Sequence, residues 1–153
     1  MGCRVIATAG GEGKMARARD LGADEVIDHY KQKISDEVKR LTGRRGVDVV
    51  FEHVGTATWS DSVASLAHHG RLVTCGATTG YDAKVDLRFL FARQLSLLGS
   101  FMGSLGELHE ALAFLGKRKL RAVVDQVYPL ADIRAAHERL EKKEQFGKVV
   151  LSV

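Results

Sequence analysis

The residues with the clearest chemical potential form a glycine segment near the N-terminus. Residues 11–16 read GEGKMA, follow a short apolar run and open a helical pattern, so they satisfy the G-x-G-x-x-G/A spacing. Glycines in this pattern let the backbone approach a pyrophosphate at a helix N-terminus. Asp28 follows near the spacing at which an acidic residue binds a ribose. The segment is therefore a candidate dinucleotide fingerprint.

Two other interpretations of this segment remain open, because one residue argues against the fingerprint. Glu12 would put a carboxylate where two phosphates should lie, which argues against a pyrophosphate cradle at this turn. The glycines also suit a tight strand-to-helix turn that needs only backbone freedom. A third interpretation, in which the turn lies on the adenosine side of a larger sheet, depends on the rest of the chain.

The composition is typical of one soluble globular domain. The chain has 153 residues, of which 45% are hydrophobic and 27% charged, and its formal net charge is +4. The plentiful aliphatic residues exclude disorder, and no apolar run approaches the ~20 residues of a membrane span. We expect a cytoplasmic location, because Cys3 and Cys75 lie far apart in sequence and form no CxxC pair.

No constellation for metal binding or nucleophilic catalysis emerges. His68 and His69 are expected near a helix C-terminus, where cations are favoured without any metal. Cys75 is expected inside a core strand, where a free cysteine acts as a small hydrophobe. Basic clusters at 39–45 and 117–121 are expected at helix ends, and dipole complementarity explains them better than nucleic-acid contact does. The sequence therefore predicts no catalytic residue and no metal ligand, and it argues against a nucleic-acid partner.

The elements that would position functional residues alternate along the chain. Near-continuous apolar runs are typical of strands that are covered on both faces, as in a parallel sheet. These runs are Arg4–Thr8, Glu25–Asp28, Val47–Phe51, Arg71–Thr74, Leu95–Met102, Ala122–Val127 and Lys148–Val153. Helical stripes lie between them, so the alternation predicts an α/β fold with right-handed crossovers.

Some boundaries in this pattern carry specific predictions. The stripe Trp59–Leu66 predicts a helix that ends near Gly70. Ser104 and Glu107 form a capping box in front of a further helix. The longest loop-like segment is 76–86. Since ligands of open α/β sheets bind beyond the carboxyl ends of strands, a site is expected in the loops that follow the strands.

Several segments together resemble the medium-chain dehydrogenase/reductase family, which holds zinc-type alcohol dehydrogenases and quinone oxidoreductases. The similar segments occur in order and over nearly the whole chain: CRVIATAGGEGKMARARDLGADEVIDHY, VDVVFEHVGTATW, GRLVTCGATTG, RQLSLLGSFMG and FGKVVLSV. The resemblance implies an NAD(P)H-dependent oxidoreductase that moves hydride to or from a carbonyl, an alcohol or an activated alkene. The alternative is a non-catalytic nucleotide-binding or scaffold module.

The resemblance also implies a Rossmann-like, doubly wound parallel sheet that lacks its first strand and the N-terminal catalytic domain. Residues 1–102 would form a truncated NAD(P)-binding domain, and residues 103–153 the segment that returns to the catalytic domain in the family. In the strand order 3-2-1-4-5-6 the missing strand is the central one, so the strands at 4–8 and 47–51 would each lack an inner neighbour. The isolated chain is expected to be inactive.

Three ways of closing this gap are open. A strand could come from another copy, from a rearranged C-terminal strand Lys148–Val153, or from a complementing N-terminal polypeptide. We take the second as a speculative expectation, because that strand is apolar enough to pair in a core. The resemblance also implies a homodimer, since the strand Leu95–Met102 commonly pairs with its twin in the family and an aliphatic edge needs cover.

By the resemblance, the end of the second family strand selects the cofactor, and here it carries no acid. An Asp or Glu at that end binds the ribose of NAD, whereas small residues and a base accept the 2′-phosphate of NADP. Lys14 follows the turn, so NADP(H) is favoured over NAD(H). His29 falls where related sequences often carry a tyrosine near that phosphate, or it is a plain loop residue. The chain carries no zinc ligands, so zinc in the intact enzyme stays unassigned.

The other cofactor-binding candidates match family segments that lie close to the nucleotide. Glycine admits close contact there, although simple turns and solvated side chains remain open alternatives. With Lys14 and His29, the full set is Thr8, Gly10, Gly11, His53, Val54, Gly55, Gly76, Ala77, Phe101, Met102, Gly103 and Lys148.

Overall fold

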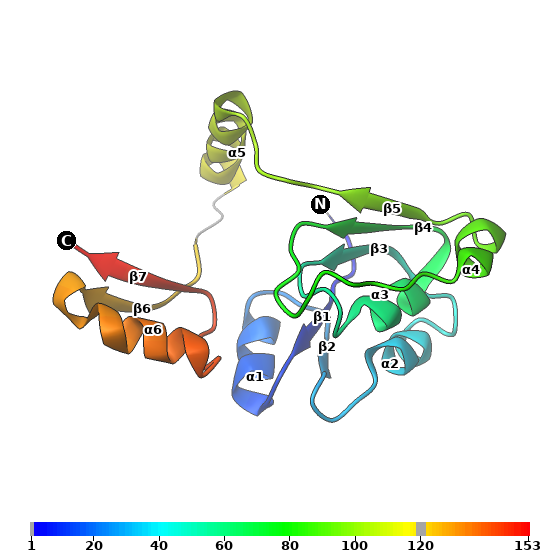
Figure 1. Ribbon diagram of the computed structural model, residues 1–153, viewed down its shortest axis with the longest axis horizontal. Coiled ribbons are helices and arrows are strands. Elements are labelled where there is room, and N and C mark those ends of the chain that lie inside the picture. The colour runs from blue at the N-terminus through cyan, green and yellow to red at the C-terminus, as the bar shows by residue number, and fades with distance from the viewer. Residues whose placement is uncertain (1, 119–121) are drawn as a thin grey trace. The chain divides into compact units, whose positions relative to one another are not determined.

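The chain is described by a computed structural model that covers residues 2–118 and 122–153 (Figure 1). It divides into two compact units, Met1–Phe101 and Met102–Val153. Lys119 and Arg121 of the second basic cluster lie outside the described residues. Each unit is described by itself.

Strands and helices alternate strictly through the first unit, as the apolar runs predict. Every adjacent pair of strands is parallel, and each is joined by a crossover that contains a helix. The elements are β1 (Ile6–Ala9), α1 (Glu12–Asp20), β2 (Glu25–Asp28), α2 (Ile34–Leu41), β3 (Val47–Glu52), α3 (Trp59–Ser65), β4 (Leu66–Thr74), α4 (Leu87–Ala92) and β5 (Ser96–Gly99).

The strands of this unit form two separate groups instead of one continuous sheet. β1 pairs with β2, and β3, β4 and β5 pair in that order (Figure 1). Among the described residues, neither β1 nor β3 pairs with any further strand. The prediction that these two strands lack an inner neighbour is therefore confirmed, and the fold is the Rossmann-like α/β class.

A buried apolar cluster of the unit lies on the β3–β4–β5 side. Val63 from α3, Leu66 and Leu72 from β4, and Leu95 before β5 form one buried cluster. Val50, Trp59, Leu90 and Leu97 pack against it. Strand β4 is thus central both to hydrogen bonding and to apolar burial.

The predicted boundary between α3 and β4 is wrong. The helix ends at Ser65 and the strand begins at Leu66, whose backbone is extended. Leu66 is fully buried in either assignment, so helical periodicity could not exclude the strand. The guanidinium of Arg93 donates to the Leu66 carbonyl and fixes this end. His68 and His69 consequently lie in β4 and not at a helix end.

Two further expectations for this region need correction. Cys75 lies just beyond β4 and is exposed, so it is not a core residue. The strand expected at Leu95–Met102 is confined to Ser96–Gly99, because Phe101 and Met102 lie beyond the last β4 partner and are almost fully exposed. In both cases the apolar character of the residues led to a predicted strand that is longer than the strand paired in the structure.

The second unit is a small α/β element. It contains α5 (Leu105–Arg118), β6 (Val124–Pro129), a 3₁₀ turn (Leu130–Asp132), α6 (Ile133–Glu141) and β7 (Lys148–Ser152). The predicted capping box is confirmed: the Ser104 amide donates to Glu107 at 2.6 Å, and the Glu107 amide donates to the Ser104 hydroxyl at 3.2 Å. A buried carboxylate, Asp125, receives Arg139 Nε at 2.6 Å and the Phe146 amide at 3.2 Å.

Strand β7 pairs in parallel with β6, with Val127 opposite Val150. Its hydrogen-bonding partner is therefore in the second unit. The speculative expectation that Lys148–Val153 fills the gap between the strands of the first unit is wrong for this structure. The reason is local, because β6 offers a partner only one crossover away in sequence.

Candidate functional site

The turn after β1 is held by the end of β2. The Asp28 carboxylate is buried and accepts the amides of Tyr30 at 3.0 Å and Gly11 at 3.5 Å. Gly11 has φ = 82° and caps α1, a conformation that L side chains rarely adopt. Asp28 therefore stabilises the turn itself. This bonding agrees with the interpretation that the glycines form a tight strand-to-helix turn.

An aromatic side chain covers the first glycine of this turn. A Cβ built on Gly10 would lie 2.3 Å from Cε2 of Tyr30, so any larger residue there would have to displace the ring. The ring is largely exposed on its other side, and His29 packs against its edge with centroids 4.7 Å apart. Lys14 lies in the first turn of α1, and His29 directly follows β2. The hydrogen bond from the Gly11 amide to Asp28 connects these two segments.

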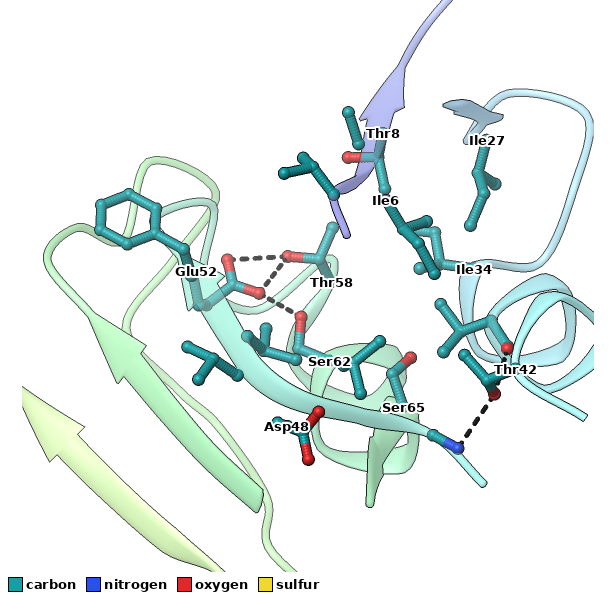
Figure 2. Close-up of a pocket in the computed structure, with 18 of the residues that line it drawn as sticks. Ile6, Thr8, Ile27, Ile34, Thr42, Asp48, Glu52, Thr58, Ser62 and Ser65 are labelled. Carbon is teal, nitrogen blue, oxygen red and sulfur yellow. Dashed lines mark hydrogen bonds between the residues drawn. The ribbon is translucent and has the colours of Figure 1, made fainter. Parts of the chain in front are cut away.

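Glu52, the last residue of β3, is the most completely enclosed acid of the site. Its side chain is only 3% exposed and accepts the amides of Val54 at 2.6 Å and Gly55 at 3.1 Å. The hydroxyl of Thr58 lies 3.0 and 2.9 Å from its two oxygens, and that of Ser62 lies 2.5 Å from Oε2 (Figure 2). Burial opposes ionisation, but these hydrogen bonds, that of Ser62 foremost, outweigh it and hold the pKa of Glu52 below its ordinary value.

The loop after β3 is also bonded to the loop after β4. The carbonyl of Val54 accepts both the amide and the hydroxyl of Thr79 at 2.8 Å, and the Thr56 amide donates to the Gly80 carbonyl at 3.3 Å. A Cβ on Gly55 would lie 2.4 Å from that carbonyl. Gly55 is thus required by the packing of the two loops against each other.

A cavity of about 730 Å³ lies between β1 and β3. Its walls are largely apolar and include Ile6, Ile27 and Ile34, and Glu52 lies at one end (Figure 2). Val38 from α2 also lines it. We call this cavity the strand slot, because it occupies the position where each of these strands lacks a neighbour. Phe51, at its rim, is 71% exposed.

The backbone of both slot-lining strands presents unpaired edges. The carbonyl of Val5 accepts amides at the start of β2, and the carbonyl of Glu52 accepts the Cys75 amide beyond β4. Since successive residues of a parallel strand direct their N–H and C=O groups to opposite edges, the groups of the intervening residues point into the slot. These residues are Ile6, Thr8, Val49 and Phe51.

The structure brings most of the predicted site residues to one region of the first unit. Thr8 lies near the end of β1, and Gly10, Gly11 and Lys14 follow that strand. His29 follows β2, His53, Val54 and Gly55 follow β3, and Gly76 and Ala77 follow β4. A Cβ on Gly76 would lie 3.0 Å from the His53 carbonyl, so the last two loops are in close contact. Phe101 closes the first unit and is 91% exposed. The candidates Met102, Gly103 and Lys148 belong to the second unit.

The sequence reasoning missed Glu52 and Tyr30. A signal for Glu52 was present, because an acid at a strand end is followed by hydroxyl residues at 58 and 62, one helical turn apart. No comparable signal marked the ring of Tyr30 over Gly10. Within residues 2–118 and 122–153, no group of three or more potential ligands could hold a metal ion, and no helix is long and apolar enough to cross a membrane.

Comparisons with known proteins agree with this fold. The family model for zinc-binding dehydrogenases matches residues 1–117. A quinone oxidoreductase of Salmonella typhimurium is 34% identical over 99% of this chain and 50% of its own length. A solved NAD-dependent alcohol dehydrogenase has a TM-score of 0.89 and 43% identity, over 99% of this chain and 44% of that one. A crotonyl-CoA carboxylase/reductase in complex with NADP has a TM-score of 0.90 and 25% identity, with 99% and 44% covered.

The fold is that of the Rossmann-like α/β domains of these enzymes. The chain belongs to the zinc-binding dehydrogenase family, within the medium-chain dehydrogenases and reductases. It spans about half the length of the curated relatives that it matches.

Proposed function

We propose that this chain provides the cofactor-binding part of an NAD(P)H-dependent oxidoreductase. The observation that carries the proposal is the convergence of the loops after β1, β2, β3 and β4 in the first unit, where ligands of open α/β sheets bind. Bound there, the nicotinamide would supply hydride exchange with a carbonyl, an alcohol or an activated alkene. The chain's own residues bind and orient the dinucleotide.

The residues after β1 fit the adenosine end of such a cofactor. The Asp28 carboxylate does not face outward at this turn, because it is buried and bonded to the amides of Gly11 and Tyr30. The exposed acid here is Glu12, in the first turn of α1. Lys14 lies in the first turn of the helix that follows. An ammonium at this position favours a 2′-phosphate over a ribose hydroxyl, so NADP(H) is the proposed cofactor. The NADP complex of the crotonyl-CoA carboxylase/reductase supports this choice, and the NAD-dependent alcohol dehydrogenase is the competing precedent.

Replacing Lys14 by alanine is expected to weaken NADPH binding about tenfold and to leave NADH binding unchanged, because only NADPH carries the 2′-phosphate. Fluorescence titration of both nucleotides measures this difference. Arg17→Ala, one turn further along α1, is the matched control and should keep the NADPH affinity. Equal NADPH affinity in Lys14→Ala and the unaltered chain would refute the assignment.

We propose that the isolated chain binds the nucleotide but does not catalyse hydride transfer. Titration with NADPH, combined with a test of hydride transfer to quinone and enal acceptors, measures both properties. Nucleotide binding with no transfer is the expected result, since Met102–Val153 is proposed to return to a catalytic domain outside these residues. Turnover by the chain would show that it is a complete catalyst. Absence of binding would favour the scaffold function instead.

The proposed partners are the dinucleotide and protein chains, in a cytoplasmic setting. A complementing N-terminal polypeptide would fill the strand slot, and a homodimer would cover the edge of β5, which pairs with β4 alone in the described part of the chain. Nucleic acid is not proposed as a partner, because three basic side chains of the first basic cluster form ion pairs with nearby acidic residues. The pairs are Lys39 with Asp36, Arg40 with Glu37, and Arg45 with Asp48. Affinity for RNA that falls steeply with salt would contradict this.

A further inference from the structure

The loop after β3 uses its amide donors internally. Two successive amides, of Val54 and Gly55, point at the carboxylate of Glu52 and not outward. The hydroxyls of Thr58 and Ser62 complete the same arrangement (Figure 2). A cradle of this kind suits an anion, and here a side chain of the protein fills it. A nucleotide at this loop therefore meets its outer surface, where His53 is exposed.

The anion in the cradle is well suited to fix the loop. All four donor groups are neutral, and hydrogen bonds to an ionised acceptor are roughly twice as strong as neutral ones. The donors come from both ends of the connection, since Val54 follows β3 directly while Ser62 lies within α3. The side chain of Glu52 therefore fixes the conformation of the whole segment 53–58.

The fixed loop in turn determines the shape of the next one. Val54 accepts two hydrogen bonds from Thr79, and Gly55 contacts the Gly80 carbonyl so closely that a displacement of the loop would break the contact. Gly76 lies against the His53 carbonyl in the same way. Both loops carry proposed cofactor-binding residues, so their mutual placement sets the surface that a dinucleotide meets.

We propose that Glu52 is a positioning residue, which holds the β3–α3 loop against the β4–α4 loop and so shapes the nucleotide surface without touching the nucleotide. This inference rests on the proposed function for its consequence in binding. Its structural half, the anchoring of Val54 and Gly55, is independent of any ligand.

The test compares Glu52→Gln with the unaltered 153-residue chain. The amide group has nearly the same volume, but it removes the charge and one acceptor atom. Hydrogen exchange at the amides of Val54 and Gly55, measured without nucleotide, is expected to rise about 10- to 100-fold. The dissociation constant for NADPH is expected to rise about 5-fold or more. Unchanged exchange at both amides would overturn the proposal.

Two further variants separate positioning from general destabilisation. Leu95→Ala opens a cavity in the core cluster without removing any hydrogen bond to Glu52, so it should lower the melting temperature but preserve the NADPH affinity of the folded protein. Glu52→Asp keeps the charge on a shorter side chain, and it should give intermediate exchange and partly restored affinity. If Glu52→Gln does not fold, Glu52→Asp decides, and exchange equal to that of the unaltered chain would refute the proposal.

The outcomes also separate this inference from the proposed function. If the unaltered chain binds no NADPH, the proposed function fails, while the exchange measurement still tests the anchoring. If NADPH binds equally well to Glu52→Gln with its loop loosened, the proposed function stands and Glu52 has no effect on binding, which overturns the positioning.

Discussion

A separate polypeptide that supplies one parallel strand to the slot between β1 and β3 is expected to stabilise the first unit strongly. The slot is lined by apolar side chains and faced by backbone groups of Ile6, Thr8, Val49 and Phe51 that no strand pairs. An apolar small molecule would leave these backbone groups unpaired, whereas a strand pairs with both edges at once. The favoured occupant is therefore a polypeptide.

The half of the Salmonella typhimurium quinone oxidoreductase that this chain does not match is a suitable probe, expressed as a separate polypeptide. At a hundredfold excess over its dissociation constant, binding should add about 2.7 kcal/mol of stability. For a unit of this size that corresponds to a rise in melting temperature on the order of 10 °C. Differential scanning calorimetry measures the rise, and hydrogen exchange at the four slot-facing residues locates the strand.

A proline variant supplies the control for this experiment. The Val49 amide points into the slot, so Val49→Pro should weaken the complementation while β3 keeps its bonds to β4. Stabilisation without protection of the slot-facing amides, or equal stabilisation of Val49→Pro, would show that the polypeptide binds elsewhere.

Replacing Leu72 by alanine is expected to destabilise the first unit by about 2–5 kcal/mol. Leu72 is 0% exposed, lies in the central strand of the β3–β4–β5 sheet and belongs to the buried cluster with Val63, Leu66 and Leu95. Whole domains have stabilities of about 5–15 kcal/mol, so the loss would remove a large part of the total. Urea denaturation followed by circular dichroism measures it.

Leu98→Ala is the matched control, because it removes the same atoms from the neighbouring strand at a site that is 46% exposed. It should cost less than half as much as Leu72→Ala. Equal denaturation midpoints for the two variants would mean that the core does not lie where the structure has it.

The fold was largely predictable because apolar runs and glycine stops report burial directly. The parallel strands β1 to β4 and the vacancy between β1 and β3 follow from the alternation together with the family's strand order. The error at Leu66 has a physical cause, since full burial is compatible with either a helix or a strand. The predicted strand continues beyond Gly99, where the observed strand ends. An apolar side chain does not show whether the strand that carries it has a hydrogen-bonding partner.

The site was predictable in position but not in its internal bonding. Strand ends located the loops, and the resemblance selected residues within them. Whether Gly55 serves a ligand or a neighbouring loop depends on the approach of Gly80, which lies 25 residues later. The filled cradle around Glu52 likewise depends on long-range geometry, because its donors come from a loop and a helix that only the fold brings together.

The location of the bound dinucleotide is the most direct test of the central claim, that the turn after β1 belongs to the adenosine side. Transferred cross-saturation NMR, or a crystal structure with NADPH, would locate its phosphates. The expected result is the 2′-phosphate beside Lys14 with the diphosphate away from the first glycine turn. A diphosphate bound to the amides of Gly11 and Gly13 would contradict the claim, because this turn would then be the pyrophosphate cradle itself.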